Sequence, residues 1–217
     1  MNITLRITGI TRMSGERICI SGYDAVTNKY YRPILENGYL TSSFLNQNPE
    51  HISIFSLVTF EYTHPISNPV KPHIEDLIIS ENIIKIENDL NTVLDQNNFL
   101  SDIADHSIEQ VFGSYMDVVD NHHIVFDGYG KRSLGTIISP KCTVTKDSNN
   151  NTRVSLIDQT GFQLSNVKCV SYDNKYCIPG NYQNIPIRIS LSRRWKRPSD
   201  DEFYYWVQIS GIFPLNR

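Results

Sequence analysis

The stretch Ile10–Ile34, ITRMSGERICISGYDAVTNKYYRPI, predicts a β-hairpin and decides the fold class of the chain. Residues 17–23 alternate between apolar and small side chains, as a half-buried strand does, and the turn residues Met13–Glu16 precede them. A second apolar run covers residues 29–35, after a loop of hairpin length at residues 24–28. The stretch therefore predicts two neighbouring strands joined by a short loop.

Three arginines, Arg12, Arg17 and Arg32, lie on these predicted strands or in their connecting turn. Guanidinium groups that lie close together repel one another unless an anion sits between them. Their clustering predicts an anionic ligand at the hairpin. The alternative is that each arginine extends over the sheet or pairs with a nearby acid such as Glu16 or Asp24.

Further strands flank the hairpin and predict a small barrel. Residues 2–11 alternate between apolar and polar side chains, which predicts a first strand with one buried face. Residues 52–63 are rich in β-favouring side chains, and three prolines then interrupt residues 64–73. An apolar run over residues 77–86 would close a barrel of five strands.

The second half of the chain begins with a change of period. Apolar residues follow helical spacing from residue 87 to Ile103, and a second, short helix is expected from about Ser107 to Phe112, ended by Gly113. Residues 114–132 read as a loop. Short strands separated by turn residues follow, at 134–139, 142–146, 153–158, 162–172, 185–192 and 203–213.

The predicted fold is mainly β, with two consecutive small OB-like β-barrels joined by a short helical segment. We expect the first barrel to cover residues 1–88, the helical connector and its loop residues 89–132, and the second barrel residues 133–217. Short strands at this spacing, found twice, favour small barrels over a doubly wound α/β sheet.

Two blocks of residues suggest a family. The first consists of Thr11, Arg12, Gly15, Arg17, Cys19, Ile20, Gly22, Arg32, Pro33 and Ile34. The second consists of Val111–Gly113 and, some twenty residues later, Ser133–Ile138. Together they resemble the dual OB-containing domain, a bacterial family of two consecutive OB-like barrels. The resemblance implies recognition of nucleic acid or a nucleotide in prokaryotic conflict or defence systems, with no enzymatic activity of the domain itself.

The net charge of −3 is distributed unevenly along the chain. Residues 1–65 hold five Lys or Arg and five Asp or Glu, residues 66–130 hold two against twelve, and residues 131–217 hold thirteen against six. A polyanion would be repelled by the middle and attracted by the C-terminal part. The acidic middle also favours an alternative function, a protein-interaction adaptor in which this segment binds a basic partner.

A second candidate site lies in the basic C-terminal part. Arg193, Arg194, Trp195, Lys196 and Arg197 form a loop before a strand that begins with the aromatic run Tyr204–Trp206. OB folds bind single strands by combining a basic groove with aromatic faces on which bases stack. The alternative is an exposed basic loop balanced by the acidic residues 200–202, with the aromatic side chains buried.

The ligand contacts predicted from sequence are therefore Arg12, Arg17, Arg32, Arg193, Arg194, Trp195, Lys196 and Arg197. The arginines and Lys196 would pair with phosphates, and Trp195 would stack on a base. We expect nucleic acid, single-stranded in the OB manner, or a small nucleotide as the partner, and no cofactor.

Motifs for catalysis are lacking in the sequence. His122 and His123 with Asp117, Asp120 and Asp127 could hold a metal, but adjacent strand residues point in opposite directions and the usual ligand spacings do not occur. The prediction is a non-enzymatic protein without a metal. A metal-dependent hydrolase with scattered ligands is the less favoured alternative.

The remaining features bear on location. The four cysteines lack Cys-x-x-Cys spacing, which favours reduced, buried thiols over a zinc or redox site. No apolar run approaches the roughly 20 residues of a membrane helix, and the first residues do not resemble a signal peptide. We therefore expect a cytoplasmic protein that does not bind membranes.

Overall fold

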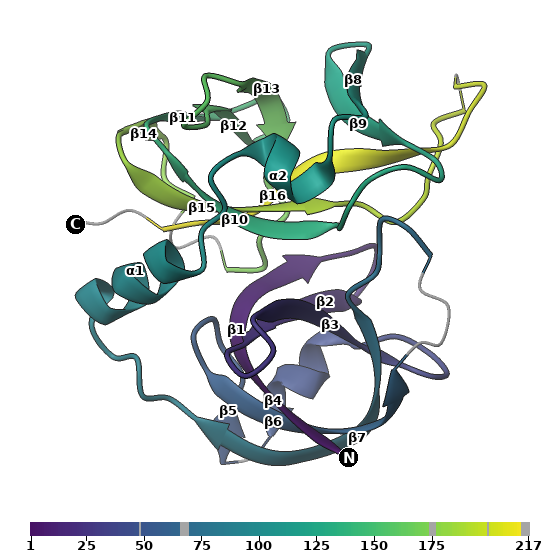
Figure 1. Cartoon of the computed structure of the whole chain (residues 1–217), viewed down its shortest axis with the longest axis vertical. Helices are drawn as coiled ribbons and strands as arrows, with labels where there is room; N and C mark the ends of the chain where they lie inside the picture. The colour runs from purple at the N-terminus through teal and green to yellow at the C-terminus, as the bar shows by residue number, and fades with distance from the viewer. Residues whose placement is uncertain (48, 66–69, 174–176, 199, 214–217) are drawn as a thin grey trace. The chain divides into compact units, whose positions relative to one another are not determined.

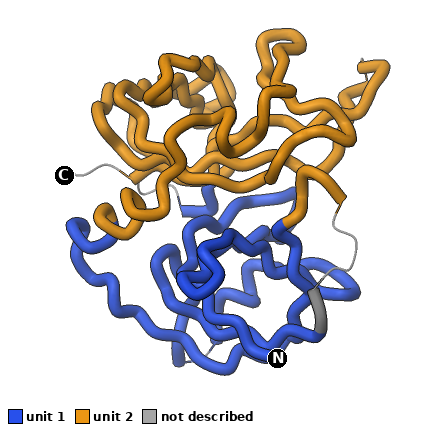
Figure 2. Tube along the Cα trace, viewed as in Figure 1, with its two compact units in different colours: residues 1–69, 75–96, 171–173 blue, residues 70–74, 97–170, 174–217 orange. Residues whose placement is uncertain are grey.

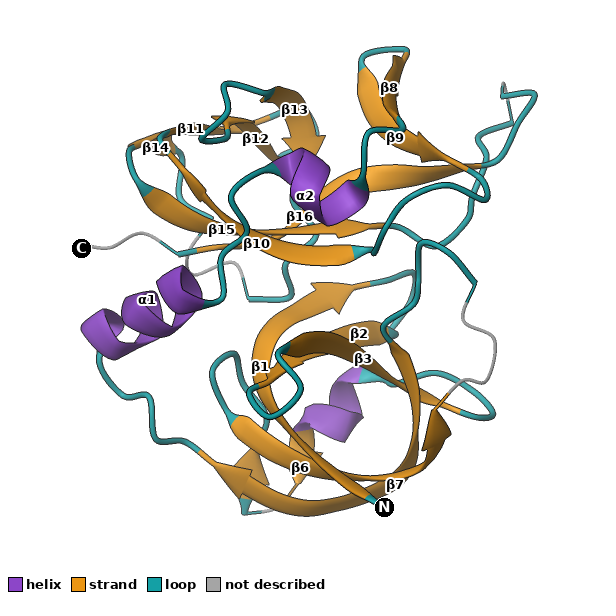
Figure 3. Ribbon diagram, viewed as in Figure 1, coloured by secondary structure: helices purple, strands orange, loops and turns teal. Residues whose placement is uncertain are grey.

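A computed structural model describes residues 1–47, 49–65, 70–173, 177–198 and 200–213. Strands predominate among these residues, with two α-helices (Figure 3). The chain forms two compact units, shown in Figure 2. Unit 1 consists of residues 1–69, 75–96 and 171–173, and unit 2 consists of residues 70–74, 97–170 and 174–217.

Unit 1 is a closed barrel with the strand order β1-β2-β3-β7-β6 (Figure 1). Its strands are β1 (Asn2–Arg12), β2 (Ile18–Asp24), β3 (Lys29–Leu35), β6 (Leu57–Pro65) and β7 (Asp76–Glu87). Neighbours are antiparallel except β3 and β7, which run parallel. Between β3 and β6 lie the 3-10 turn η1 (Ser42–Leu45) and the two-residue strands β4 (Asn46–Gln47) and β5 (Glu50–His51). This five-stranded barrel is the architecture of an OB fold.

The barrel interior follows from the alternation of the strands. Leu5, Ile7, Ile20 and Phe60 are fully buried in one hydrophobic cluster, because alternate residues of a strand face the same side. Gly22 lets β1 and β2 approach closely, since a Cβ there would lie 2.8 Å from the Cβ of Leu5. The hairpin β2–β3 predicted from the sequence is confirmed.

Two helices follow the barrel. The first, α1 (Val93–Asp102), includes one of the points where the chain passes from unit 1 to unit 2, between residues 96 and 97. The second, α2 (Ile108–Phe112), begins after Ser107, whose hydroxyl accepts a hydrogen bond from the Gln110 N–H at 3.0 Å. It ends at Gly113, which has a φ of 89° that favours glycine. The predicted short helix ending at Gly113 is therefore confirmed.

Unit 2 contains two antiparallel sheets. The five-stranded sheet has the order β10-β15-β16-β9-β8, and the four-stranded sheet has the order β13-β12-β11-β14. The strands are β8 (Met116–Val119), β9 (His122–Phe126), β10 (Leu134–Ser139), β11 (Lys141–Lys146), β12 (Thr152–Ile157), β13 (Gln163–Lys168), β14 (Gly180–Tyr182), β15 (Ile185–Leu191) and β16 (Tyr204–Ile212).

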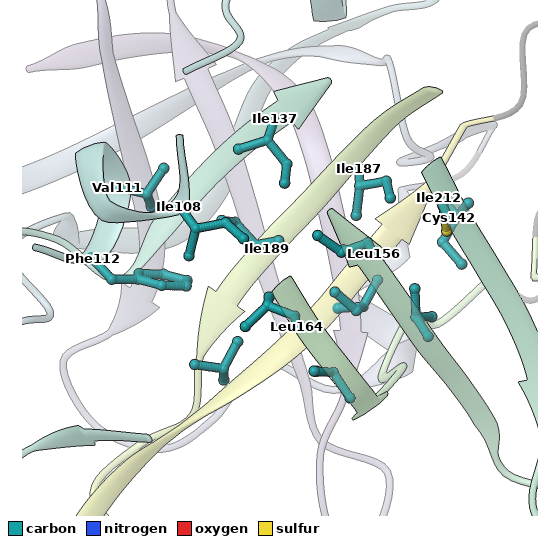
Figure 4. Packing of buried hydrophobic residues seen from close by; sticks show 14 of the residues in the cluster. Ile108, Val111, Phe112, Ile137, Cys142, Leu156, Leu164, Ile187, Ile189 and Ile212 are labelled. Carbon is teal, nitrogen blue, oxygen red and sulfur yellow. The ribbon is translucent and has the colours of Figure 1, made fainter. Parts of the chain in front are cut away.

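One hydrophobic core lies between these two sheets and α2 (Figure 4). Ile187 and Ile189 enter it from the five-stranded sheet, Leu156 and Leu164 from the four-stranded sheet, and Phe112 from α2. All five side chains are buried. The alternation seen in the sequence of this half thus gives each sheet one apolar face.

The hairpin of β8 and β9 corrects a prediction, because residues 114–132 were expected to form a loop. Asp120 and Asn121 connect the two strands with φ angles of 47° and 63°. The two-residue hairpin turn of type I′ requires positive φ at both central positions, and Asp and Asn tolerate it better than most residues. Burial of Ile124 and Val125 then favours a strand over a loop.

Candidate nucleic-acid interface

The loop between β15 and β16 holds Trp195 in a fixed position. The Trp195 N–H donates to the Tyr204 carbonyl at 3.0 Å, and the Tyr204 N–H donates to the Trp195 carbonyl at 3.1 Å. The indole N–H of Trp206 donates to the same Trp195 carbonyl at 3.1 Å. Although its backbone is held by three hydrogen bonds, the Trp195 side chain is 53% exposed. Its indole is thus presented to solvent on a fixed backbone.

A row of buried and partly buried rings lies next to Trp195. The ring centroids of Trp195 and Trp206 are 5.8 Å apart, those of Trp206 and Tyr204 are 5.8 Å apart, and those of Tyr204 and Phe126 are 5.9 Å apart. Tyr204, Tyr205 and Trp206 are all buried, so β16 supplies support for the exposed ring. Burial of these three side chains agrees with the alternative prediction from the sequence, in which the basic loop is exposed and the aromatic residues after it are buried.

Phe203 provides a second exposed aromatic face, at 40% exposure. The guanidinium carbon of Arg194 lies 4.2 Å from the centroid of its ring, and Nζ of Lys196 lies 5.5 Å from it. Arg194 Nε also donates to Asp127 Oδ2 at 2.7 Å, which draws the loop toward the turn after β9. Two cations therefore lie over one ring, as cation–π attraction favours. Phe203 was not among the residues predicted from the sequence, although it directly precedes the aromatic run of β16.

Arg197 lies in the same loop but is held by carboxylates. Its Nη2 is 2.8 Å from Asp120 Oδ2 and 2.8 Å from Asp200 Oδ1, and its guanidinium carbon lies 4.8 Å from the Trp206 ring centroid. The hydrogen bond to Asp200 is the main cause that raises the pKa of Arg197 and lowers the pKa of Asp200. Arg197 thus fastens the loop to the β8–β9 turn. Arg193 and Lys196 are exposed.

The two histidines of β9, His122 and His123, contact neighbouring protein groups. The His122 ring lies edge-on to Trp206, with centroids 5.6 Å apart, and His123 Nε2 accepts a hydrogen bond from the Ser165 N–H at 3.0 Å. Burial is the first cause that lowers the pKa of each. In the part of the chain that the structure describes, no group of three or more His, Cys, Asp or Glu could hold a metal.

Arg12 and Arg17 lie at one hairpin of the unit 1 barrel, between β1 and β2. Arg12 donates to the Tyr172 carbonyl at 2.8 Å from Nη2 and 3.2 Å from Nε, and its guanidinium carbon is 5.5 Å from the Tyr172 ring centroid. Arg17 Nε donates to the Ser14 carbonyl at 2.8 Å, and its guanidinium carbon lies 4.7 Å from the exposed ring of Tyr39. Each arginine is therefore paired with a tyrosine ring.

Arg32 is placed differently from the other predicted contacts. It is 3% exposed and forms an ion pair with Asp76, with 3.0 Å between Nη1 and Oδ1. Its backbone N–H donates to the Glu75 carbonyl at 2.8 Å. The partner is an acid 44 residues away in the sequence rather than a local one. Because Arg32 is buried in the barrel wall, it does not belong to an exposed binding surface.

Comparison with known proteins identifies one family. The family model described as Dual OB-containing domain matches residues 4–212, nearly the whole chain. Neither a curated protein nor a solved structure matches. Among the described residues, no helix has both the length and the apolar character required to cross a membrane.

Proposed function

The chain belongs to the Dual OB-containing domain family, and on this premise we propose that it recognises nucleic acid or a nucleotide without catalysing a reaction on it. Trp195 and Phe203 stack on bases, and Arg193, Arg194 and Lys196 pair with phosphates. Arg197 positions the loop through Asp120 and Asp200. The resemblance that suggested this family also suggests a role in a prokaryotic defence system.

The observation that carries the proposal is the exposed indole of Trp195 on a backbone held by three hydrogen bonds. A large aromatic side chain is usually buried, because its apolar surface is unfavourable in water. An indole held rigidly at the surface loses little conformational freedom when it stacks on a base. Such stacking contributes about 1–3 kcal/mol per base.

The hairpin between β1 and β2 supports a second contact, made by unit 1. OB folds bind oligonucleotides with the loop between their first two strands among other elements. Here that loop bears Arg12 and Arg17, each next to a tyrosine ring, Tyr172 or Tyr39. We propose that these two arginines pair with phosphates of the same ligand class.

The proposal predicts binding that weakens as salt is added, because phosphate contacts release counterions. Fluorescence anisotropy of labelled single-stranded DNA, single-stranded RNA and a mononucleotide, each at two salt concentrations, tests it. Trp195→Ala should lower affinity by about fivefold or more, since one stacked base is lost. Quenching of tryptophan fluorescence on binding provides a second readout.

A pair of variants with the same change in charge separates local pairing from overall attraction. Arg193→Glu/Lys196→Glu reverses two exposed cations of the loop, whereas Lys141→Glu/Lys168→Glu reverses two exposed lysines of the four-stranded sheet. We expect the first variant to lose binding and the second to retain most of it. Equal affinities for the two variants, or no binding by the unaltered protein at low salt, would overturn the proposal.

A further inference from the structure

Tyr115 and Tyr129 form an exposed aromatic pair in unit 2. Their ring centroids are 4.6 Å apart, and the two side chains are 57% and 47% exposed. Tyr115 directly precedes β8, and Tyr129 lies in the turn that follows β9. Both rings are therefore at the same end of the β8–β9 hairpin, and neither contributes to the hydrophobic core of the unit.

Backbone contacts fix the turn that bears Tyr129. Its N–H donates to the Phe126 carbonyl at 3.1 Å, and the N–H of Lys131 donates to the Phe112 carbonyl at 3.1 Å. Gly130, with a φ of 98°, allows close packing, since a Cβ there would lie 2.9 Å from the Cβ of Pro72. Tyr129 thus lies in a turn whose backbone is fixed by hydrogen bonds. Lys131, the exposed cation of this turn, lies beside Gly113.

Asp127 joins this turn to the loop that bears Arg194. Its Oδ2 accepts from Arg194 Nε at 2.7 Å, and its Oδ1 accepts from the Tyr205 hydroxyl at 3.1 Å. Figure 1 shows the chain after β9 and the loop before β16 on the same side of unit 2. The negative charge of Asp127 is offset by Arg194. Asp127 and Arg194 therefore connect the turn that bears Tyr129 with the ring of Phe203.

We propose that the exposed rings of this turn and loop form one binding strip for single-stranded nucleic acid, an inference that rests on the proposed function. We define the aromatic strip as Tyr115, Tyr129, Phe203 and Trp195, together with the cations Lys131, Arg194 and Lys196 of the same turn and loop. Successive unstacked bases occupy the rings while the cations pair with the phosphates between them. The ligand is thus an oligonucleotide and not a mononucleotide.

The presence of several exposed rings and cations favours this ligand class. A mononucleotide has one base, so a mononucleotide stacked on Trp195 or Phe203 would leave the rings of Tyr115 and Tyr129 exposed. In a duplex the base faces are stacked inside, so the rings could not reach them without opening the strands. Exposed cations close to exposed rings match a chain in which an anionic phosphate follows every base.

A length series tests the inference with the full chain. The probes are fluorescein-labelled oligothymidylates and oligouridylates of roughly 2 to roughly 12 nucleotides, since an OB fold covers about 4–16 nucleotides. We expect affinity to rise with length beyond about 4 nucleotides. Tyr115→Ala/Tyr129→Ala should weaken binding of the longest probe about tenfold and leave the shortest probe unaffected.

Two further variants keep the test decisive. Tyr115→Phe/Tyr129→Phe retains both rings and should bind the longest probe as the unaltered protein does, which excludes a folding defect as the cause. Phe162→Ala removes an exposed ring of similar exposure elsewhere in unit 2, and should have no effect. Thermal unfolding measured by circular dichroism checks the fold of each variant.

The outcomes distinguish this inference from the function on which it rests. If short and long probes bind equally well, or if the double alanine variant binds the longest probe normally, the strip is overturned while nucleotide recognition at Trp195 stands. If Trp195→Ala and the double alanine variant bind every probe normally, both proposals fail. Binding of a protein partner at the strip, with no probe bound at low salt, would also overturn both.

Discussion

Arg32 and Asp76 form an ion pair inside the wall of the unit 1 barrel, with 3.0 Å between Nη1 and Oδ1. The two residues are direct neighbours on the parallel strands β3 and β7. Burial acts to lower the pKa of Arg32, but the net shift is upward, and the nearby carboxylates of Asp76 and Glu75 contribute to it. Arg32 therefore keeps its positive charge in a place where a charge without a partner would be unfavourable.

We predict that Arg32→Met and Asp76→Asn each lower the free energy of unfolding by about 3–5 kcal/mol, because each leaves an uncompensated buried group. Urea unfolding followed by circular dichroism measures the change. The variant with both substitutions should lose less than the sum of the two losses. A loss below about 1 kcal/mol, as exposed ion pairs give, would contradict a buried pair.

Asp158 supports a prediction about pH. Its carboxylate is buried and accepts hydrogen bonds from the Ile108 N–H at 2.9 Å, the Thr160 N–H at 2.9 Å and the Phe162 N–H at 3.0 Å. Burial acts to raise the pKa of Asp158, but these donors and the Thr160 hydroxyl outweigh it and lower the pKa. The charged carboxylate of Asp158 therefore contributes its full stabilisation at pH values above about 3.9, the pKa of an aspartate in the unfolded chain. This stabilisation is lost as the pH falls through the lower pKa of the folded state.

We therefore expect Asp158→Asn to lower stability at neutral pH, since the amide cannot accept all of these hydrogen bonds. The difference from the unaltered protein should shrink as the pH falls below about 4, where protonation removes the same contribution. Urea unfolding at a series of pH values measures it. Asp201→Asn, at an exposed position, is the control. A difference that stays constant down to pH values of about 2 would contradict the lowered pKa.

Salt dependence should separate Lys196 from Arg197. Each phosphate contact to a single strand contributes about 0.7 to the slope of log affinity against log salt. Lys196→Ala should reduce the slope by that amount, because Lys196 is exposed and lies over Phe203. Arg197→Ala should weaken binding with little change in slope, because Asp120 and Asp200 already offset its charge. Equal reductions in slope would show that Arg197 contacts phosphate itself.

The barrel of unit 1 follows from local patterns in the sequence. Alternation places Leu5, Ile7 and Ile20 on one face, and each is fully buried. The β8–β9 hairpin was missed because its turn uses Asp120 and Asn121 in place of the more familiar turn pairs that contain glycine. Local patterns thus predict strands well and unusual turns poorly.

The candidate site was predictable in composition but not in exposure. The sequence indicated the basic loop and its tryptophan, and the structure exposes Trp195. It could not show that Arg32 is buried against Asp76, because that partner is 44 residues away. It also could not separate Phe203, which is exposed, from the buried Tyr204 beside it, since that difference arises where β16 begins.

Cysteine chemistry gives a further prediction. Burial raises the pKa of the Cys142 thiol to about 12, and the neighbouring Cys169 acts in the same direction. Since alkylation requires the thiolate, Cys142 should resist iodoacetamide at a pH of about 8 in the folded protein and react after unfolding in urea. Mass spectrometry of the digested protein measures the labelled fraction. Rapid labelling of Cys142 in the folded protein would contradict its burial.

The packing of α2 on β10 accounts for two of the motif residues that suggested the family. A Cβ at Gly135 would lie 2.5 Å from Cγ1 of Val111, closer than real contacts allow. Gly135→Ala should therefore lower the free energy of unfolding by about 1–3 kcal/mol, the usual cost of overpacking. Val111→Ala alone should cost roughly 2 kcal/mol, since it removes buried methyl groups.

The variant with both substitutions should cost clearly less than the sum, because the missing Val111 methyl groups leave room for the new Cβ at Gly135. Urea unfolding of the two single variants and the double variant completes this cycle. A matched control is Gly161→Ala, where nothing lies within 4 Å of the added Cβ and only the φ of 91° is unfavourable. Combining Val111→Ala with Gly161→Ala should give additive losses. If the Gly135 pair were additive as well, close packing of α2 against β10 would not be the reason for glycine at this position.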